Sequence, residues 1–181
     1  YQPMGLQKIA FRPLERFDPH MVAPTSDDGV FRKQVMKGYV HDPAAAMLGG
    51  VAGHAGLFGN ASDVAAIFQM LLDGGVYNGK RLLQAETVQR FTRRQHTGSR
   101  RGLGFDKPEP NPRLPNPASS YSSPETFGHT GFTGTCAWAD PRHGLVFVFL
   151  SNRVHPSEEN NALVRGNYRT ELQRLVYESL R

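Results

Sequence analysis

The stretch TGTCAWADPRHGLVFVFLS, residues 133–151, decides the fold of this chain. It holds two segments of strand-like composition, 133–139 and 145–151, on either side of the turn-forming sequence DPRHG at 140–144. Apolar residues occupy every position from 145 to 150, which is typical of a strand that is covered on both faces. The sequence therefore predicts an antiparallel pair whose second strand is central and buried.

The tripeptide His129-Thr130-Gly131 leads into this pair, and Gly134 follows three positions after Gly131. Small residues on an edge strand let the backbone of a ligand lie alongside and pair with the strand. His129 and Thr130 then offer hydrogen-bonding side chains to the ligand, and the next backbone N–H, that of Phe132, can face a developing oxyanion. The same tripeptide also occurs in ordinary turns, and that interpretation stays open.

Helical periodicity precedes and follows the strands. After Asn60, apolar residues recur at i, i+3, i+4, i+7 and i+8, which predicts a helix over 61–72 with one apolar stripe: Val64, Ile67, Phe68, Leu71 and Leu72. A turn at Asn78-Gly79 leads to a short helix at 85–92. A last helix is predicted over 161–180, with the stripe Val164, Tyr168, Leu172, Leu175, Val176 and Leu180. Helices, then antiparallel strands, then a helix predict the α+β class.

Two segments show no periodicity. Residues 1–43 are interrupted by five prolines and can be ordered only by packing on something else. Residues 106–126 contain six of the thirteen prolines and form a long loop. A loop of this length is typical either of a functional lid or of a surface excursion, and the sequence does not separate the two.

Length and composition exclude several classes. A chain of 181 residues fits one domain, and 39% hydrophobic residues argue against wholesale disorder. The longest apolar run, 145–150, is far shorter than the ~20 residues that span a bilayer, so no membrane span is expected. Cys136 is the single cysteine and cannot close an internal disulfide. The chain opens at Tyr1 without an initiator Met, which indicates a mature product or an excised piece.

The basic residues gather between positions 80 and 101, where seven of them accompany one acid, Glu86. The seven are Lys80, Arg81, Arg90, Arg93, Arg94, Arg100 and Arg101. They indicate either a patch for an anionic polymer or, more simply, a solvated helix face and turn. No nucleic-acid motif accompanies them, so nucleic acid is not expected as a partner.

Metal and cofactor chemistry have little support. Seven histidines are present, yet none forms His-x-His or His-x3-His, and no metal or cofactor is expected. His41-Asp42 is either a ligand pair or a structural hydrogen-bonded pair. The glycine-rich segment 49–59 lacks the Lys-Ser/Thr of a phosphate-binding loop and indicates a tight bend.

The chain also lacks the usual signatures of a serine nucleophile. Gly-x-Ser-x-Gly is absent, none of the ten serines is followed by Lys at the third position, and Tyr-x-Asn is absent.

Taken in order, several motifs resemble the C-terminal portion of serine hydrolases of the class C beta-lactamase and penicillin-binding group. Residues 3–6 (PMGL) resemble the Pro-Leu-Gly-Met element of that group, and 49–58 (GGVAGHAGLF) resemble its glycine turn before a helix. Residues 79–88 resemble the next segment, and 127–135 (FGHTGFTGT) with 144–152 resemble its third active-site motif and the strands that follow. The match spans nearly the whole chain.

The resemblance implies roles for particular residues. The third motif is Lys-Thr-Gly or His-Thr-Gly in the family, so His129, Thr130 and the backbone N–H of Phe132 are implied as catalytic, the last as an oxyanion donor. Gly131, Thr133 and Gly134 are implied as substrate-binding. The nucleophile of Ser-x-x-Lys and the Tyr of Tyr-x-Asn precede residue 1. Residues 1–181 are thus expected to be a partial beta-lactamase-like domain of antiparallel strands with packed helices.

The function implied is acyl-serine transfer by the intact protein on D-alanyl peptides, beta-lactams or esters, with this chain alone inactive. The alternative is a non-catalytic module of the same fold that binds peptidoglycan-like ligands. The resemblance implies a periplasmic or cell-surface bacterial protein, a small-molecule or peptidoglycan-derived substrate, and the missing N-terminal part of the domain as partner. Residues 23–25 and 40–42 also resemble a subgroup whose domain can be fused to a glycoside hydrolase.

Overall fold

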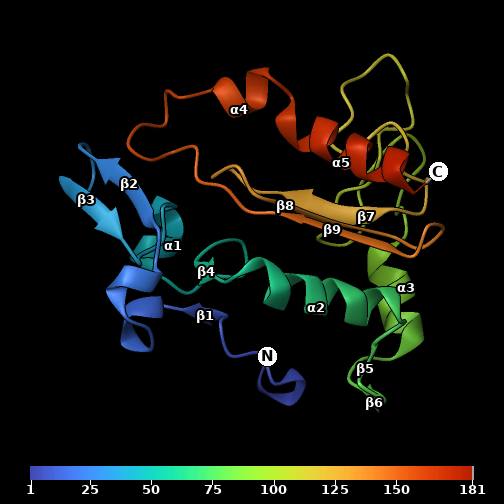
Figure 1. The fold of residues 1–181 in the computed structure, drawn as a ribbon, viewed down its shortest axis with the longest axis horizontal. Helices are drawn as coiled ribbons and strands as arrows, with labels where there is room; N and C mark the ends of the chain where they lie inside the picture. Colours follow the sequence, from blue (N-terminus) through green and yellow to red (C-terminus); the bar gives the residue numbers. More distant parts are fainter. Residues whose placement is uncertain (181) are drawn as a thin grey trace.

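A computed structural model describes residues 1–180 and has at its centre a three-stranded antiparallel sheet (Figure 1). The strands are β7 (Phe127–Thr130), β8 (Cys136–Asp140) and β9 (Leu145–Phe149), in the order β7-β8-β9. Thr130 pairs with Cys136, and Cys136 pairs with Phe149. The predicted hairpin over 133–151 is confirmed, and the strand that carries His129 is paired beside it.

The position of the central strand differs from the prediction. All five residues of β8 are buried, whereas all five residues of β9 are half-buried, because β8 is flanked by two strands and β9 lies at an edge of the described sheet. Trp138, in the middle of β8, is 1% exposed and packs with Ala118 and the rings of Phe147 and Phe149. Within the described sheet the strand over 145–150 is thus an edge strand and not the central one predicted, since strand order and not the apolar run decides which strand is enclosed there.

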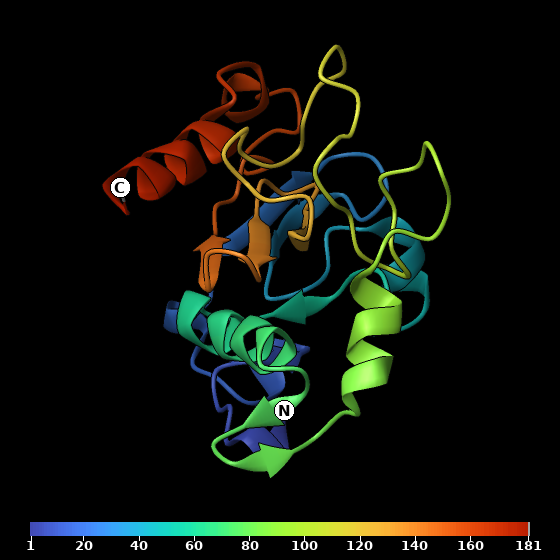
Figure 2. The same ribbon diagram turned by 90° about the vertical axis from the view of Figure 1, so that its right-hand side faces the viewer.

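Helices cover the two faces of this sheet (Figure 2). The helix α2 (Ala61–Leu72) packs against β8 and β9, as its periodicity predicts, and the Asn60 side chain caps it by accepting from Asp63 N–H. Its predicted apolar stripe is only half-buried, with the ring of Phe68 stacked 6.4 Å from that of Phe127. The sheet beneath α2 is narrow, so part of the stripe reaches beyond it.

The C-terminal segment departs from the single helix that was expected. It forms α4 (Ala162–Arg165) and α5 (Tyr168–Ser179), separated at Asn167, whose φ of 53° is left-handed. The buried residues of α5 are Gln173 and Tyr177, while the predicted stripe is largely exposed: Val164, Tyr168, Leu172, Leu175 and Leu180. Among the described residues the predicted stripe therefore stays largely exposed, and polar side chains with partners inside the protein set the buried face of α5.

The segment after α2 follows the prediction. Gly74 and Gly75, both with positive φ, end the helix, and β5 (Val76–Tyr77) and β6 (Lys80–Arg81) form a hairpin. Its two-residue turn, Asn78-Gly79, has φ of 48° and 75°. The short helix α3 (Ala85–Thr92) follows, at the predicted bounds.

The N-terminal segment contains short elements that its sequence did not reveal. Three are 3-10 helices: η1 (Gln2–Met4), η2 (Pro13–Glu15) and η3 (Pro19–Met21). The strand β1 (Ala10–Phe11) pairs with β4 (Leu57–Phe58), and β2 (Pro24–Asp28) forms a hairpin with β3 (Gln34–Lys37). The helix α1 (Pro43–Met47) follows the hairpin. The hairpin docks onto the chain beyond β9, where the Asn152 side chain donates to Pro24 O and Thr25 O at 2.5 and 2.8 Å. This contact supplies the external packing that the segment needs.

Residues 107–126 form no helix or strand but are tied to the body of the protein. The Lys107 ammonium donates to the carbonyls of Glu125 and Thr126 at 2.9 Å each, and Ser119 N–H donates to Gln173 in α5 at 2.8 Å. These hydrogen bonds hold the loop against the rest of the protein, so it is not a free surface excursion. None of the helices within residues 1–180 is long and apolar enough to cross a membrane.

Candidate functional site

The strand β7 lies at an edge of the sheet, and within residues 1–180 only its first half has a backbone neighbour on the outer side. There Asp106 N–H donates to Gly128 O at 2.7 Å, and Gly128 N–H donates to Asp106 O at 3.0 Å. Because backbone direction alternates along a strand, the residue two positions on, Thr130, presents its backbone to the same edge. Among the described residues no backbone pairs with this edge beside Thr130, whose carbonyl has only the His129 ring as a neighbour, at 2.7 Å from Nδ1.

His129 is exposed on this strand, and both of its ring nitrogens have partners. Nδ1 lies 2.7 Å from Thr130 O, and Nε2 lies 2.9 Å from a guanidinium nitrogen of Arg101. A carbonyl only accepts and a guanidinium only donates, so this geometry suits the tautomer with the proton on Nδ1. The same guanidinium lies 3.2 Å from the buried carboxylate of Asp106. The site therefore has a positive charge from Arg101 beside the imidazole.

The turn after β7 contains the proposed oxyanion donor. Gly131 N–H donates to Thr135 O at 2.8 Å, and Gly134 N–H donates to Gly131 O at 3.0 Å. Within residues 1–180, the N–H of Phe132 has no hydrogen-bond partner, and its residue is 62% exposed. A Cβ on Gly131 would lie 2.3 Å from Thr135 Oγ1, so a larger residue here would require the Thr135 side chain to move. Gly134 has φ of 107°, and a Cβ there would lie 2.6 Å from Ser151 Oγ.

Side chains from distant parts of the sequence surround Phe132. The guanidinium of Arg153 lies 4.5 Å from the centre of the Phe132 ring, and its Nε donates to Phe132 O at 2.8 Å. The His41 ring stacks on the same ring at 5.5 Å, and His41 also lies 3.1 Å from Glu158 and 3.2 Å from Ser26. The exposed ring is thus fixed by its neighbours.

The pair His41-Asp42 is divided between two roles. Asp42 accepts from Ala45 N–H at 2.7 Å as the cap of α1, and its carboxylate lies 3.0 Å from the His54 ring. The hydrogen bonds from Ala45 and His54 lower the pKa of Asp42. His41 faces Phe132 instead. No group of three or more potential metal ligands occurs among the residues that the structure describes. The two side chains have separate partners and do not form a hydrogen-bonded pair with each other.

The basic stretch 80–101 is largely engaged within the protein. Arg81 donates to Gly74 O and Leu83 O, and Arg94 donates to Pro108 O. Arg100 pairs with Asp106 at 2.7 Å, and this hydrogen bond raises the pKa of Arg100. With Arg101 bound as well, four of the seven basic residues have internal partners, which favours the structural interpretation over a patch for an anionic polymer.

At the far end of β8 a buried carboxylate joins three segments. Asp140 accepts from Ser123 N–H and Oγ–H at 2.9 and 2.6 Å, from Tyr177 OH at 2.6 Å and from Arg142 N–H at 3.0 Å, and lies 2.9 Å from the His143 ring. Burial by itself would raise the pKa of Asp140, but these hydrogen bonds outweigh burial and hold it well below its usual range. Burial and the bond to Asp140 together raise the pKa of Tyr177.

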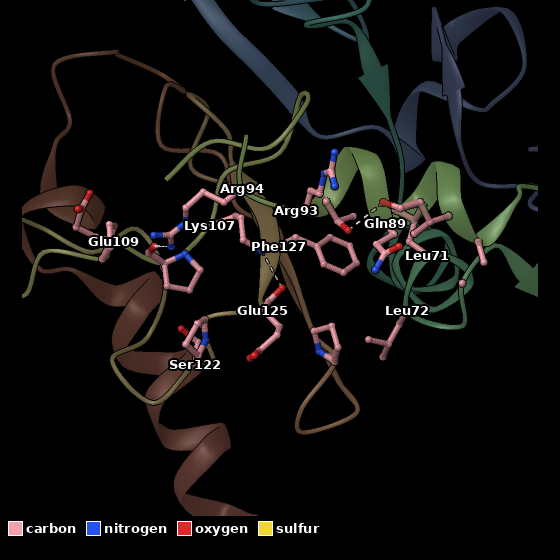
Figure 3. A pocket seen from close by; sticks show the side chains of 18 of the residues that line it. Leu71, Leu72, Gln89, Arg93, Arg94, Lys107, Glu109, Ser122, Glu125 and Phe127 are labelled. Atoms are coloured by element: carbon pink, nitrogen blue, oxygen red, sulfur yellow. Dashed lines mark hydrogen bonds between the residues drawn. The ribbon is translucent and has the colours of Figure 1, made fainter. Parts of the chain in front are cut away.

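A cavity of about 1070 Å³ lies between the end of α2, α3 and the 107–126 loop (Figure 3). Arg94, Lys107 and Glu109 line one side of it, Leu71 and Leu72 the other. Burial first, and then the charge of Arg94, lower the pKa of Lys107 to about 8. None of the predicted site residues lines this cavity, although Phe127, the first residue of β7, does.

The sequence located the strand and turn of the site but not the side chains that brace them. His129, Thr130, Gly131, Phe132, Thr133 and Gly134 all lie at the end of β7 and in the turn that follows. The sequence did not indicate three arginines: Arg101, Arg153 and Arg169. The backbone N–H of Arg153 also donates to Thr133 O. The Arg169 guanidinium donates to Gly131 O and Thr135 O at 3.2 Å each. No local signal marks them, because each acts on a segment far away in the sequence.

Comparison with known proteins agrees with this architecture. A family profile described as "Beta-lactamase" matches residues 5–168. A protein of Escherichia coli (strain K12) named "Putative D-alanyl-D-alanine carboxypeptidase" is 39% identical over 167 residues, covering 86% of this chain and 38% of that protein. A protein of the same name from Salmonella agona (strain SL483) is 37% identical over 183 residues, covering 92% of this chain and 42% of its own length.

Among solved structures, a beta-lactamase from Mycobacterium bovis superposes with a TM-score of 0.53 at 22% identity, over 69% of this chain and 46% of that one. This likeness concerns the fold alone. The chain spans about two fifths of the length of the two curated relatives. Since the family profile covers most of the sequence and the α+β fold agrees with it, the chain belongs to the beta-lactamase family.

Proposed function

We propose that this chain forms the oxyanion-side half of a serine hydrolase that acts by acyl-serine transfer on D-alanyl peptides. The observation that carries the proposal is the unpartnered N–H of Phe132, next to a strand edge that is open beside Thr130. A backbone N–H in such a position suits the negative charge that develops on a carbonyl oxygen during acyl transfer. The names of the curated relatives support the choice of D-alanyl peptide over beta-lactam or ester.

Each predicted site residue then has a role. The substrate backbone pairs with the edge of β7 at Thr130, with Gly131, Thr133 and Gly134 shaping the turn beneath it. The Phe132 N–H binds the carbonyl oxygen. His129, with the Arg101 guanidinium 2.9 Å from its ring, offers a positively charged surface to the carboxylate of a terminal D-alanine. No cofactor enters this scheme.

The nucleophile comes from outside these 181 residues. None of the ten serines stands three positions before a lysine, so the attacking serine and its base belong to a further part of the domain. Two exposed features support a domain that continues: the outer edge of β9 and the apolar side chains of Tyr168, Leu172 and Leu175 on α5. In the full-length protein the serine oxygen attacks the peptide carbonyl, D-alanine leaves with the proton, and water releases the acyl group.

The location and the partners follow from the substrate. Peptides ending in D-alanine belong to the bacterial cell wall, so a periplasmic or cell-surface site of action is part of the proposal. A fused glycoside hydrolase domain remains a hypothesis that rests on residues 23–25 and 40–42.

The proposal is tested with the full-length protein and a fluorescent penicillin, followed by peptide mass spectrometry. We expect one label on a serine outside residues 1–181, and release of D-alanine from a D-alanyl-D-alanine peptide. The matched control is the same protein with the labelled serine changed to alanine. A label on one of the ten serines of this chain would contradict the assignment of the nucleophile.

The second candidate, a binding module without catalysis, is favoured by the same absence of a nucleophile from the chain. It predicts that the full-length protein binds D-alanyl peptides in calorimetry yet neither takes the label nor releases D-alanine. The two experiments together separate the candidates.

A further inference from the structure

The turn after β7 is held by an arginine from the opposite side of the sheet. Arg169 lies in the first turn of α5, and one of its guanidinium nitrogens lies 3.2 Å from both Gly131 O and Thr135 O. The same two carbonyls already accept from Gly134 N–H and Gly131 N–H within the turn. Arg169 therefore closes a small network around a single peptide unit.

That peptide unit joins Gly131 to Phe132 and carries the free N–H. A trans peptide is planar, so its carbonyl oxygen and its N–H point in opposite directions from one rigid plate. Gly131 O is fixed by two donors, Gly134 N–H and the Arg169 guanidinium, and Phe132 N–H is left without a partner. A restraint on the oxygen thus sets the direction of the N–H.

The charge of Arg169 adds to this geometric effect. A guanidinium stays protonated in proteins, and hydrogen bonds to a charged donor are stronger than neutral ones. A cation on a carbonyl oxygen draws electron density toward that oxygen, which makes the N–H at the other end of the same peptide a better donor. The contact also requires no movement when negative charge develops at the site.

We propose that Arg169 is a positioning residue for the oxyanion donor and acts on Phe132 N–H through the Gly131–Phe132 peptide. The inference rests on the proposed function, since it gives Phe132 N–H a task. It assigns a role in turnover to a side chain whose hydrogen bonds go to the carbonyls of the turn. Arg174, in the same helix, provides the contrast, because its partners among the described residues are Glu171 and Glu178 of α5.

The test compares Arg169→Met, Arg169→Lys and the control Arg174→Met in the full-length protein. A chromogenic aryl ester gives kcat and KM, and a boronic acid, which forms a tetrahedral adduct with the serine, gives a transition-state-like affinity. We expect Arg169→Met to lower kcat by ~10- to 100-fold with KM nearly unchanged, and to weaken the boronic acid by a similar factor. Arg169→Lys should recover part of the loss, and Arg174→Met should behave as wild type.

Thermal unfolding of each variant separates a positioning role from a stability role. If Arg169→Met does not fold, Arg169→Gln, which keeps a donor but loses the charge, is judged by the same kcat and boronic acid criteria. A folded Met or Gln variant with wild-type kcat and boronic acid affinity would overturn the inference alone. A wild-type protein that neither hydrolyses the ester nor takes the penicillin label would overturn the proposed function, and the inference with it.

Discussion

The two ends of strand β8 are built in opposite ways. At the Cys136 end, the adjoining turn keeps its carbonyls occupied by Arg153 and Arg169 and leaves the N–H of Phe132 free. At the Asp140 end, a buried carboxylate accepts hydrogen bonds from several segments. Within residues 1–180, the first end leaves one backbone donor without a partner, and the other end satisfies its polar groups inside the protein.

This difference separates stability from activity along one short strand. Buried polar networks lock segments together, and breaking one is costly because its members lose their partners. A donor without a partner contributes little to the free energy of folding. It lowers the energy of a reaction step only when a negative charge develops beside it. Variants at the Asp140 end should therefore change unfolding, and variants at the turn should change turnover.

The largest expected effect is at Asp140. Asp140→Ala leaves the Ser123 and Tyr177 donors buried without an acceptor, and we expect a loss of ~3–5 kcal/mol in the free energy of unfolding. Chemical denaturation of the full-length protein measures it. The control Tyr177→Phe removes a single donor and should cost ~1–2 kcal/mol. The kcat of the folded Asp140→Ala protein should stay at the wild-type level.

Lowering the pH tests whether the charge of Asp140 is what stabilises the fold. The folded pKa of Asp140 lies below its ordinary value, so its contribution to stability is complete above about pH 4 and declines as the pH falls toward the folded pKa. The difference in stability between wild type and Asp140→Ala should therefore shrink below pH 4. A difference that is constant down to pH 2 would mean that the carboxylate charge is not what the network stabilises.

A smaller effect is expected at Lys107, which binds the carbonyls of the 107–126 loop. Its pKa is lowered to about 8 in the folded protein, whereas an unfolded lysine titrates near ~10.4. Between these values the unfolded state binds more protons, so stability should rise with pH by on the order of 1–3 kcal/mol relative to Lys107→Met. Denaturation of both proteins between pH 7.5 and 10 measures this. Parallel stability curves would contradict the lowered pKa.

The smallest expected effect on stability is at Arg153. Arg153→Met removes the contact with the exposed Phe132 ring and the hydrogen bonds to Phe132 O and Glu158 O, at a cost of ~0.5–1 kcal/mol. Phe132 O belongs to the peptide that follows the donor peptide, so kcat should fall less than in Arg169→Met. Steady-state kinetics on both variants checks the order, and a larger loss in Arg153→Met would contradict the peptide-plane argument.

Local patterns in the sequence located most of the elements around the site. The helix α2 follows from its periodicity and cap, the β5–β6 turn from Asn78-Gly79, and the β8–β9 hairpin from its turn-forming residues. The strand that carries His129 and the turn at Gly131 were predicted for the same reason, because each depends on a few neighbouring residues.

The remaining features depend on residues far apart in the sequence. Strand order makes β8 central, although its sequence, CAWAD, is less apolar than that of β9. Gln173 and Tyr177 define the buried face of α5 because their partners, Ser119 and Asp140, lie in other segments. The contacts of Arg169 with backbone carbonyls leave no trace in the sequence of the turn, since a carbonyl is present at every residue.

Cys136 gives the chain an internal reporter. It is the single thiol, it pairs directly with Thr130 at the end of β7, and burial first of all raises its pKa to about 11. A buried thiol of this kind is nearly inert toward alkylating reagents until the sheet opens. The rate at which an alkylating reagent modifies Cys136 therefore measures how often β7 separates from β8. Slower modification in the presence of a D-alanyl peptide would be evidence for the proposed binding at the edge of β7.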